Sequence, residues 1–163
     1  AVFLEQNRGD EIQYNIELPA EDVTLNCDAR QISRVLTNLM KNAAESIEGA
    51  KQDGHDDVKG IVSLSIATEQ HHVRINVEDD GRGLPTQDRG RLTEPYVTTR
   101  AKGTGLGLAI VKKIIEEHDG TLELSDRDPR GARVTILLPM VDSDANAREN
   151  ESESGTLTET TSS

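Results

Sequence analysis

The chain has 163 residues, and its 18 Lys and Arg residues against 30 Asp and Glu residues give a formal net charge of −12. This length fits one domain, with or without a tail, and suffices for a real hydrophobic core. The acidity argues against a nucleic-acid partner, because such proteins neutralise phosphates with a basic surface. The single cysteine, Cys27, excludes an intramolecular disulfide and a cysteine-based zinc site.

The composition changes sharply after residue 140. Residues 141–163 contain nine Ser or Thr residues, six acids and one Arg, with only Val141 and Leu157 as large aliphatic side chains. Such a segment buries too little apolar surface to offset the entropy of ordering it. We therefore predict an acidic, disordered tail that carries −5 of the charge and leaves −7 for residues 1–140.

The first half of the chain is expected to form two strands and one long helix. Polar and apolar residues alternate over 12–18, which predicts a half-buried strand, and a short strand is expected around residues 23–25. Asp28 is a suitable N-cap for the helix that follows, in which apolar residues recur at helical spacing from 32 to 47. Gly49 is expected to end this helix.

The second half is expected to begin with a β-hairpin, since alternation over 62–66 and 73–77 flanks a turn at 69–71. Residues 79–104 lack strong periodicity, and loops of this length inside a compact domain are commonly functional. The remaining expected elements are a helix that starts near Leu106 and is ended by Gly120, and two strands at 122–124 and 132–138.

Hairpins that alternate with lone helices favour a mixed, mainly antiparallel sheet with helices on one face. The expected fold class is therefore an α/β (α+β) two-layer sandwich. We expect this folded domain to span residues 11–140.

Two glycine clusters bracket the long loop. The first is Asp79-Asp80-Gly81-Arg82-Gly83, and the second is Lys102-Gly103-Thr104-Gly105-Leu106-Gly107-Leu108, which runs into a helix. Glycines let backbone amides approach a ligand, and a helix N-terminus attracts phosphate. Either cluster alone is equally consistent with a flexible turn, and neither a Rossmann nor a Walker A pattern is present. Two clusters that flank one loop favour a nucleotide lid.

The first predicted helix places Asn38 and Asn42 four residues apart, hence on one face. Asn is a poor residue for a helix interior, because its amide competes for backbone hydrogen bonds. An amide oxygen can ligate Mg²⁺ that also bridges substrate phosphates. The alternative is that both side chains face solvent or are hydrogen-bonded within the core.

Four motifs in this order resemble the ATP-binding catalytic domain of sensor histidine kinases, in the group that includes gyrase, Hsp90 and MutL. The resemblance covers roughly residues 10–139, and it is most similar to the nitrogen-regulation kinases of the NtrY-like type. Tyr96 stands where Phe is usual in the third motif. The motifs are Asn38-Leu-Met-Lys-Asn42-Ala-Ala-Glu, Asp79-x-Gly81-x-Gly83, Thr93-Glu-Pro-Tyr96-Val-Thr-Thr-Arg100 and Gly103-Thr-Gly-Leu-Gly-Leu-Ala-Ile-Val-Lys-Lys-Ile.

The resemblance implies a Bergerat-type fold in which ATP lies between the helices and a flexible lid at about residues 84–102. Asp79 would accept a hydrogen bond from the adenine amino group, Asn42 would ligate Mg²⁺, and Asn38 would support phosphate or metal. Asn38 and Asn42 would be the catalytic residues. The implied ATP-binding residues are Asn38, Lys41, Asn42, Asp79, Gly81, Gly83, Leu84, Thr99, Arg100, Lys102, Gly103, Thr104, Gly105, Leu106, Gly107, Leu108 and Thr135.

Some of these assignments have plain alternatives. Asp79 is also a turn-forming residue, Lys41 and Arg100 are equally consistent with solvated charges, and Thr135 would reach the adenine only through water. We expect the four histidines to be structural or solvent-exposed, so that this chain alone would not phosphorylate itself.

The resemblance also implies partners. The γ-phosphoryl would pass to a histidine on a separate dimerisation and phosphoacceptor domain, from which residues 1–10 would lead in, and then to a response regulator. The full-length protein would be a homodimer in the bacterial inner membrane, with this domain cytoplasmic and monomeric by itself. The alternatives are another ATPase or an anti-sigma-type serine kinase of the same superfamily, or a non-catalytic interaction module.

Overall fold

The computed structural model describes residues 12–97 and 105–140, and the expected lead-in at 1–10 and tail at 141–163 lie outside them. The described part holds five strands, two α-helices and one short 3₁₀ helix. In chain order they are β1 (Gln13–Glu17), α1 (Ala29–Gln52), β2 (Ile61–Glu69), β3 (His72–Asp79), η1 (Arg89–Arg91), α2 (Gly107–Glu117), β4 (Thr121–Asp126) and β5 (Ala132–Pro139).

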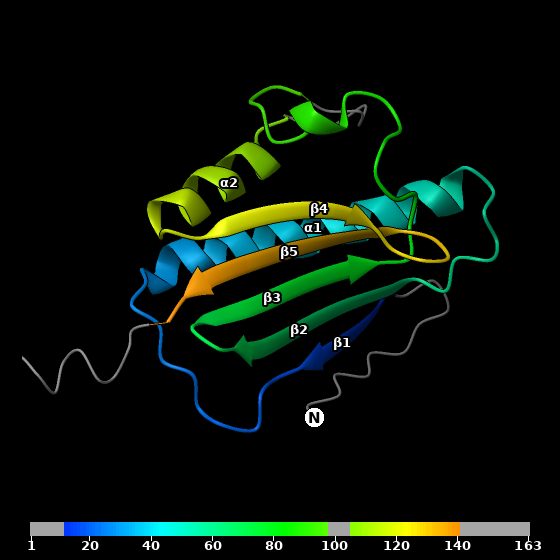
Figure 1. Ribbon diagram of the computed structural model, residues 1–163. Coiled ribbons are helices and arrows are strands. Elements are labelled where there is room, and N and C mark those ends of the chain that lie inside the picture. The colour runs from blue at the N-terminus through cyan, green and yellow to red at the C-terminus, as the bar shows by residue number, and fades with distance from the viewer. Residues whose placement is uncertain (1–11, 98–104, 141–163) are drawn as a thin grey trace, which may run out of the picture.

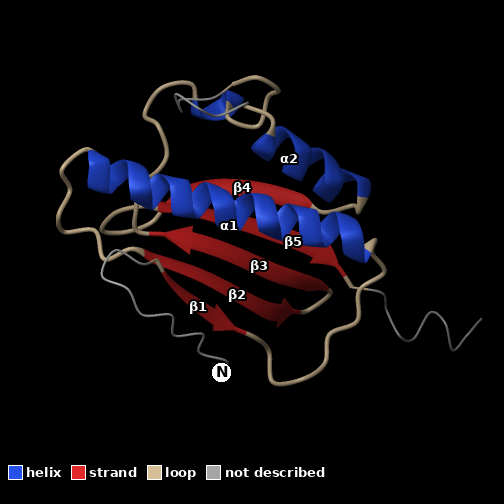
Figure 2. Ribbon diagram, turned by 180° about the vertical axis from the view of Figure 1, so that it is seen from behind, coloured by secondary structure: helices blue, strands red, loops and turns tan. Residues whose placement is uncertain are grey.

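The strands form one sheet in the order β1-β2-β3-β5-β4 (Figure 1). β1 pairs parallel with β2, and the other neighbouring strands are antiparallel. Figure 2 shows α1 crossing in front of the sheet with α2 beside it, so both helices cover the same face. This arrangement confirms the predicted two-layer sandwich with a mixed, mainly antiparallel sheet.

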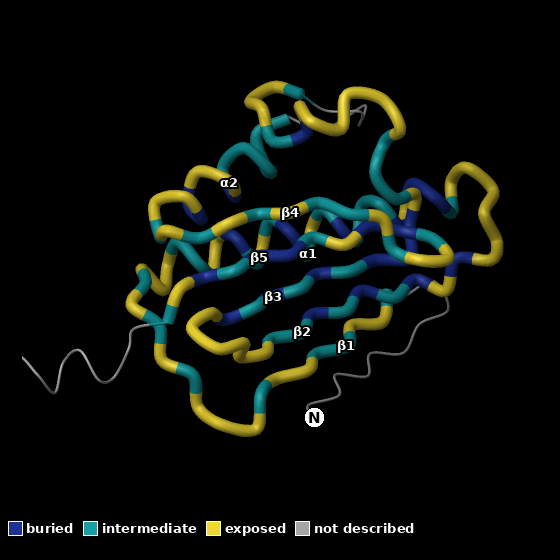
Figure 3. Tube along the Cα trace, viewed as in Figure 1, coloured by how far each residue is buried: buried dark blue, intermediate teal, exposed yellow. Residues whose placement is uncertain are grey.

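The core lies between the helices and the sheet. Buried aliphatic side chains from α1, such as Leu39 and Ile47, pack with those of α2 and of the central strands, such as Ile75, Ile115 and Ile136. Figure 3 shows the buried residues gathered along α1 and the inner strands, whereas the connecting loops are exposed. None of the helices in the described ranges is long and apolar enough to cross a bilayer.

Helix α1 begins as predicted and ends later than predicted. The Oδ1 atom of Asp28 accepts hydrogen bonds from the backbone N–H groups of Arg30 at 2.9 Å and Gln31 at 3.3 Å, which lower the pKa of this carboxyl. The helix runs past Gly49 to Gln52, so the expected end at Gly49 is wrong. Gly49 instead makes room for Arg82, whose Cζ atom would lie 2.7 Å from a Cβ at this position.

Helix α2 ends close to Gly120, as predicted, but Gly120 is not the residue in the left-handed conformation. That conformation belongs to Asp119, with φ of 55°, and not to Gly120. Gly120 is needed for space, because a Cβ there would lie 2.7 Å from the carbonyl oxygen of Leu137. His118 joins the two helices, since its Nδ1 lies 2.7 Å from the Ile114 carbonyl oxygen and its Nε2 accepts a 3.0 Å hydrogen bond from the Asp28 N–H.

The predicted short strand around residues 23–25 is absent from the structure, which has no strand between β1 and α1. Val23 and Leu25 are half-buried and pack against the core. The alternation of apolar and polar residues at 23–25 therefore reflects the burial of two side chains. The segment does not pair with a neighbouring strand.

Candidate nucleotide site

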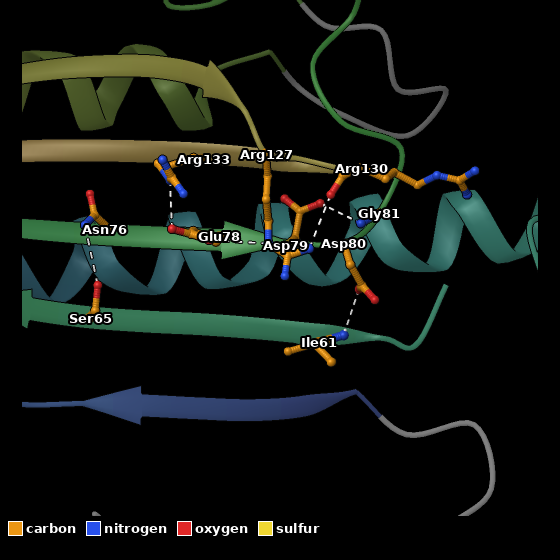
Figure 4. A network of polar contacts seen from close by, with 10 residues as sticks. All are labelled: Ile61, Ser65, Asn76, Glu78, Asp79, Asp80, Gly81, Arg127, Arg130 and Arg133. Carbon is orange, nitrogen blue, oxygen red and sulfur yellow. Dashed lines mark hydrogen bonds and ion pairs between the residues drawn. The ribbon is translucent and has the colours of Figure 1, made fainter. Parts of the chain in front are cut away.

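The site is built around the end of β3, where the chain leaves the sheet. Asp79 is the last residue of this strand, and its side chain is only 6% exposed. Its Oδ1 atom accepts 2.9 Å hydrogen bonds from the Ser46 hydroxyl on α1 and from the Gly81 N–H. Both of these bonds end on Oδ1, and neither of them uses Oδ2. Figure 4 shows Asp79 beside Gly81 at the end of the strand.

The environment of Asp79 raises the pKa of its carboxyl above the ordinary value. Burial is the main cause, and the negative charge of Asp80 acts in the same direction, whereas the hydrogen bonds from Gly81, Ser46 and Ala132 oppose the shift. A buried carboxylate without a cationic partner is costly to the fold. Such a group is a candidate for a functional site.

The next residue, Asp80, has a structural role. Its carboxylate accepts hydrogen bonds from three consecutive backbone N–H groups at the start of β2, those of Lys59 at 2.9 Å, Gly60 at 3.1 Å and Ile61 at 2.8 Å. Figure 4 shows the bond to Ile61, on the side of the strand away from Gly81. Asp80 thus fixes the chain immediately after Asp79, and the turn that follows starts from a defined position.

Two glycines of the first cluster are required by close backbone approach. A Cβ at Gly81 would lie 2.5 Å from the Ser46 hydroxyl oxygen and 2.6 Å from the Ile47 nitrogen, so Gly81 rests directly on α1. Gly83 has φ of +79°, and a Cβ there would lie 3.1 Å from the carbonyl oxygen of Gly131. The Arg82 N–H donates to the Ser46 carbonyl at 3.2 Å, which attaches the turn to the helix.

Helix α1 presents Asn38, Asn42 and Ser46 at intervals of four residues, which places them along one side of the helix. Asn38 and Asn42 are half-buried. A Cβ at Gly107, the first residue of α2, would lie 3.6 Å from Asn42 Nδ2 and 3.7 Å from Oδ1. The first motif and the last motif of the sequence therefore meet in space, at the N-terminal end of α2.

The start of α2 has an apolar N-cap residue. This residue is Leu106, whose side chain makes no capping hydrogen bond. Gly105, with φ of +70°, packs on the backbone of Tyr96, and its carbonyl accepts a 2.9 Å hydrogen bond from the Tyr96 N–H. Leu108 is partly buried against the core, which orients the helix. The N-terminus of a helix carries a partial positive charge that is suited to an anion.

Between these two ends the chain forms the described part of the long loop. Leu84 is half-buried, and η1 follows at Arg89–Arg91, an element that the sequence pattern did not predict. Arg89 pairs with Asp126 at the end of β4, with Nη1 2.8 Å from Oδ2. Figures 1 and 2 both place η1 beyond the N-terminal end of α2, away from the sheet.

Other predicted residues stand apart from Asp79 or outside the described ranges. Lys41 is exposed, and its Nζ lies 3.8 Å from Glu45 Oε1. Thr135 pairs with Asn76 across the sheet and donates a 2.9 Å hydrogen bond to the Asn76 Oδ1. Asn76 is three positions from Asp79 on the same strand and so faces the opposite side. The residues outside the described ranges are Thr99, Arg100, Lys102, Gly103 and Thr104.

The position of Thr135 corrects the expectation that it reaches the adenine side. Its side chain lies on the sheet face that the helices leave open, where it belongs to a polar row with Asn76 and Ser65. Figure 4 shows the Asn76 and Ser65 side chains of this row. The period of two along a strand separates it from the face that carries Asp79.

The sequence analysis missed two residues that shape the site, Ser46 and Gly131. Gly131 has φ of +109°, and a Cβ there would overlap the carbonyl oxygen of Asp79. A single glycine in a hairpin turn has no sequence signal that would predict its contact with Asp79. Ser46 could have been found, because it continues the four-residue spacing of Asn38 and Asn42 by one further turn.

The fold and the arrangement of the four motifs agree with a known family of ATPases. Residues 27–142 match the family described as histidine kinase-, DNA gyrase B- and HSP90-like ATPases. The chain belongs to this family, and within it to the ATP-binding catalytic domains of sensor histidine kinases.

Several of its relatives are named NtrY or NtrY-like kinases. The chain is 44% identical over 138 residues to the nitrogen regulation protein NtrY of Azorhizobium caulinodans, which is 84% of this chain and 18% of that protein. It is 43% identical over 125 residues to an NtrY-like sensor histidine kinase of Rickettsia bellii, which is 77% of this chain and 19% of that protein. The chain thus spans about a fifth of the length of these relatives.

Solved structures agree with this assignment. The catalytic domain of the histidine kinase ThkA, in a nucleotide-free form, has a TM-score of 0.64 and 28% identity, covering 79% of each chain. Full-length ShkA in complex with AMPPNP has a TM-score of 0.67 and 26% identity, covering 81% of this chain and 26% of ShkA.

Proposed function

We propose that this domain binds ATP together with Mg²⁺ and donates the γ-phosphoryl group to a histidine on a separate domain of the same protein. The observation that carries the proposal is the buried Asp79 carboxylate, which is held by α1 and the glycine turn and has no cationic partner among the described residues. The ATP analogue bound in the related ShkA structure supports the nucleotide class.

Asp79 would recognise the base. The 6-amino group of adenine is a hydrogen-bond donor, and Oδ2, which takes neither the Ser46 bond nor the Gly81 bond, would accept from it. Guanine has a carbonyl oxygen at the same position, which would face the carboxylate as a second acceptor. The site would therefore favour adenine over guanine.

The polar side of α1 and the start of α2 would hold the phosphates. The amide oxygen of Asn42 is a suitable ligand for Mg²⁺, and Asn38 lies one turn earlier on the same side of the helix. Mg²⁺ would neutralise phosphate charge at this place. Gly107 lies beside the Asn42 side chain, so a phosphate held at the α2 start would be within reach of the same Mg²⁺. Lys102, Gly103 and Thr104 would add further contacts to the phosphates.

The described residues provide positioning for phosphoryl transfer, and the proposed acceptor lies elsewhere. His55, His71 and His72 are exposed in loops and at the hairpin turn, and His118 is engaged between the two helices. Phosphoryl transfer depends mainly on positioning and charge neutralisation, so a catalytic domain needs no covalent residue of its own. We therefore place the acceptor histidine on a dimerisation domain that precedes this domain.

The wider setting follows from the relatives and is part of the proposal. A response regulator would take the phosphoryl group from the histidine, as in a two-component system of nitrogen regulation. The parent protein would be a homodimer in the inner membrane with this domain on the cytoplasmic side, and the isolated domain would be monomeric. The acidic segment at 141–163 would be a linker or tail.

The experiment is a calorimetric titration of the domain with AMPPNP, with and without Mg²⁺, followed by a kinase assay with the histidine domain of the parent joined in cis. We expect Mg²⁺-dependent binding and an acid-labile phosphohistidine on the added domain. A domain that binds no nucleotide contradicts the proposal. Phosphoserine on a partner would instead identify a serine kinase, and a partner that binds equally well without nucleotide would indicate an interaction module.

A further inference from the structure

Ser46 is the point at which the first glycine turn is attached to α1. Its hydroxyl donates a 2.9 Å hydrogen bond to Asp79 Oδ1, and its carbonyl oxygen accepts from the Arg82 N–H at 3.2 Å. Gly81, which lies between Asp79 and Arg82 in the chain, is so close to Ser46 that any side chain at position 81 would collide with Ser46. Three successive contacts of the turn thus converge on one helical residue.

From this geometry we infer that Ser46 is a positioning residue for adenine recognition, which holds the Asp79 carboxylate by Oδ1 so that Oδ2 faces the 6-amino group. The inference rests on the proposed function, because it concerns the same nucleotide site. It goes further in assigning the selectivity for adenine to a pair of residues, of which only Asp79 belongs to the four sequence motifs.

The physical argument is that an aspartate side chain has two oxygens, and their roles are fixed only if one of them is held. The Gly81 N–H alone would hold Oδ1 from the turn that Asp79 itself begins. The Ser46 hydroxyl adds a side-chain donor from helix α1, and the Ala132 N–H at the start of β5 acts on the same carboxylate, so the carboxylate is oriented relative to the body of the domain. A hydrogen bond to an ionised group also favours its charged form, which is the better acceptor for an amino group.

The orienting role of Ser46 can be tested through the pH dependence of ATP binding, because Asp79 has few charged neighbours. Within the described residues the ionised group that acts on it is Asp80, whose carboxylate is turned toward the N–H groups of residues 59–61. A change at Ser46 leaves these contacts in place. Differences in pH dependence between variants therefore report on Asp79 and its hydrogen bonds.

The test compares Ser46→Ala with wild type in calorimetric titrations with ATP and with purine riboside triphosphate, which lacks the 6-amino group. Ser33→Ala is the matched control, because it makes the same change at an exposed position of the same helix. We expect Ser46→Ala to weaken ATP binding about tenfold, which corresponds to one hydrogen bond to a charged group. Binding of the deamino analogue should change little, and Ser33→Ala should bind both ligands as wild type does.

Two further measurements separate positioning from a merely structural role. Across pH 5–8, the loss of ATP affinity on acidification should occur at higher pH in Ser46→Ala than in wild type. Ser46→Thr keeps the hydroxyl and should restore the wild-type pH profile. In an Asp79→Asn background, Ser46→Ala should have no further effect on ATP binding, because the carboxylate that it orients is gone.

The outcomes are distinct. If wild type binds no ATP, the proposed function fails. If wild type prefers ATP to the deamino analogue and Ser46→Ala keeps the same preference and pH profile, the inference about Ser46 is overturned while the function stands. Equal weakening of both ligands by Ser46→Ala would also overturn it, since this result shows a general loss of the site. Circular dichroism verifies that each variant is folded, and Ala is a better helix former than Ser.

Discussion

Glu78 and Asp79 are neighbours on β3, yet they lie on opposite faces of the sheet and in opposite surroundings. On the open face, Glu78 Oε1 lies 2.7 Å from Arg133 Nε and its Oε2 lies 3.3 Å from Arg127 Nε. On the helix-covered face, Asp79 is buried and is hydrogen-bonded by neutral donors only. The fold thus pairs Glu78 with two cations and gives Asp79 none among the described residues, which supports the proposed role of Asp79 in ligand binding.

The largest expected effect comes from Asp79→Asn. An amide at this position can keep its oxygen on the Ser46 and Gly81 donors and then presents its NH₂ group to the adenine amino group, so two donors face each other and the hydrogen bond is lost. We expect ATP affinity to fall by about 10- to 100-fold, the equivalent of one charge-assisted hydrogen bond. Calorimetric titration with ATP measures this change, and an affinity within a factor of two of wild type would contradict the proposed role.

Gly81→Ala tests the attachment of the turn to α1. The added methyl group would collide with the backbone and the hydroxyl of Ser46, so the turn must move away from the helix. We expect a loss of about 1–3 kcal/mol in the free energy of unfolding, which is the usual cost of overpacking, together with weaker ATP binding. Urea denaturation provides the first value. Gly90→Ala is the matched control, because nothing lies within 4 Å of a Cβ there.

The pH dependence of stability should reveal the cost of burying Asp79. Because burial raises its pKa in the folded state above the unfolded value of 3.8, the folded protein binds more protons between these two values. The contribution of Asp79 to the free energy of unfolding is thus highest in acid and is lost as pH rises through the folded pKa.

Asp79→Asn removes this dependence and keeps an oxygen for the hydrogen bonds from Ser46 and Gly81. We expect the variant to match or exceed the melting temperature of wild type at pH 7, with an advantage that shrinks toward pH 4. Thermal melts across this range provide the comparison. A variant that is less stable than wild type at pH 7 and equally stable in acid would reverse the predicted sign.

The smallest effect is expected for Glu78→Gln, on the other face of the same strand. The ion pairs with Arg127 and Arg133 are partly exposed, and such pairs contribute about 0–1 kcal/mol to stability. ATP affinity should remain within a factor of two of wild type, because the side chain points away from the site. A tenfold loss of affinity in the same titration would remove the distinction between the two faces.

Much of the fold follows from local sequence patterns. The alternation in the hairpin strands, the Asp28 cap and the helical spacing each report on residues that are close in the chain, and they predicted the sheet and both helices correctly. The patterns were misleading where burial and pairing differ, as for Val23 and Leu25. They were also misleading where a glycine serves a distant contact, as Gly49 does for Arg82 and Gly120 for Leu137.

The candidate site was predictable in its motifs and less so in its geometry. The structure brings Asn42 to Gly107 and surrounds Asp79 with donors, which agrees with the predicted neighbourhood. Thr135 shows the limit, because a residue assigned to the site by resemblance alone, outside the four motifs, lies on the other face of the sheet. Ser46 and Gly131 shape the site through contacts between elements far apart in sequence, and such contacts become visible only in three dimensions.

The central claim is that a carboxylate at the end of β3 reads the amino group of adenine. The most direct measurement is the ratio of affinities of wild-type protein for ATP and for purine riboside triphosphate, determined by calorimetry in the presence of Mg²⁺ at pH 7.5. The account predicts a preference for ATP of about tenfold or more, in line with one charge-assisted hydrogen bond, and its loss in Asp79→Asn. Equal affinities of the wild-type protein for the two nucleotides would contradict it.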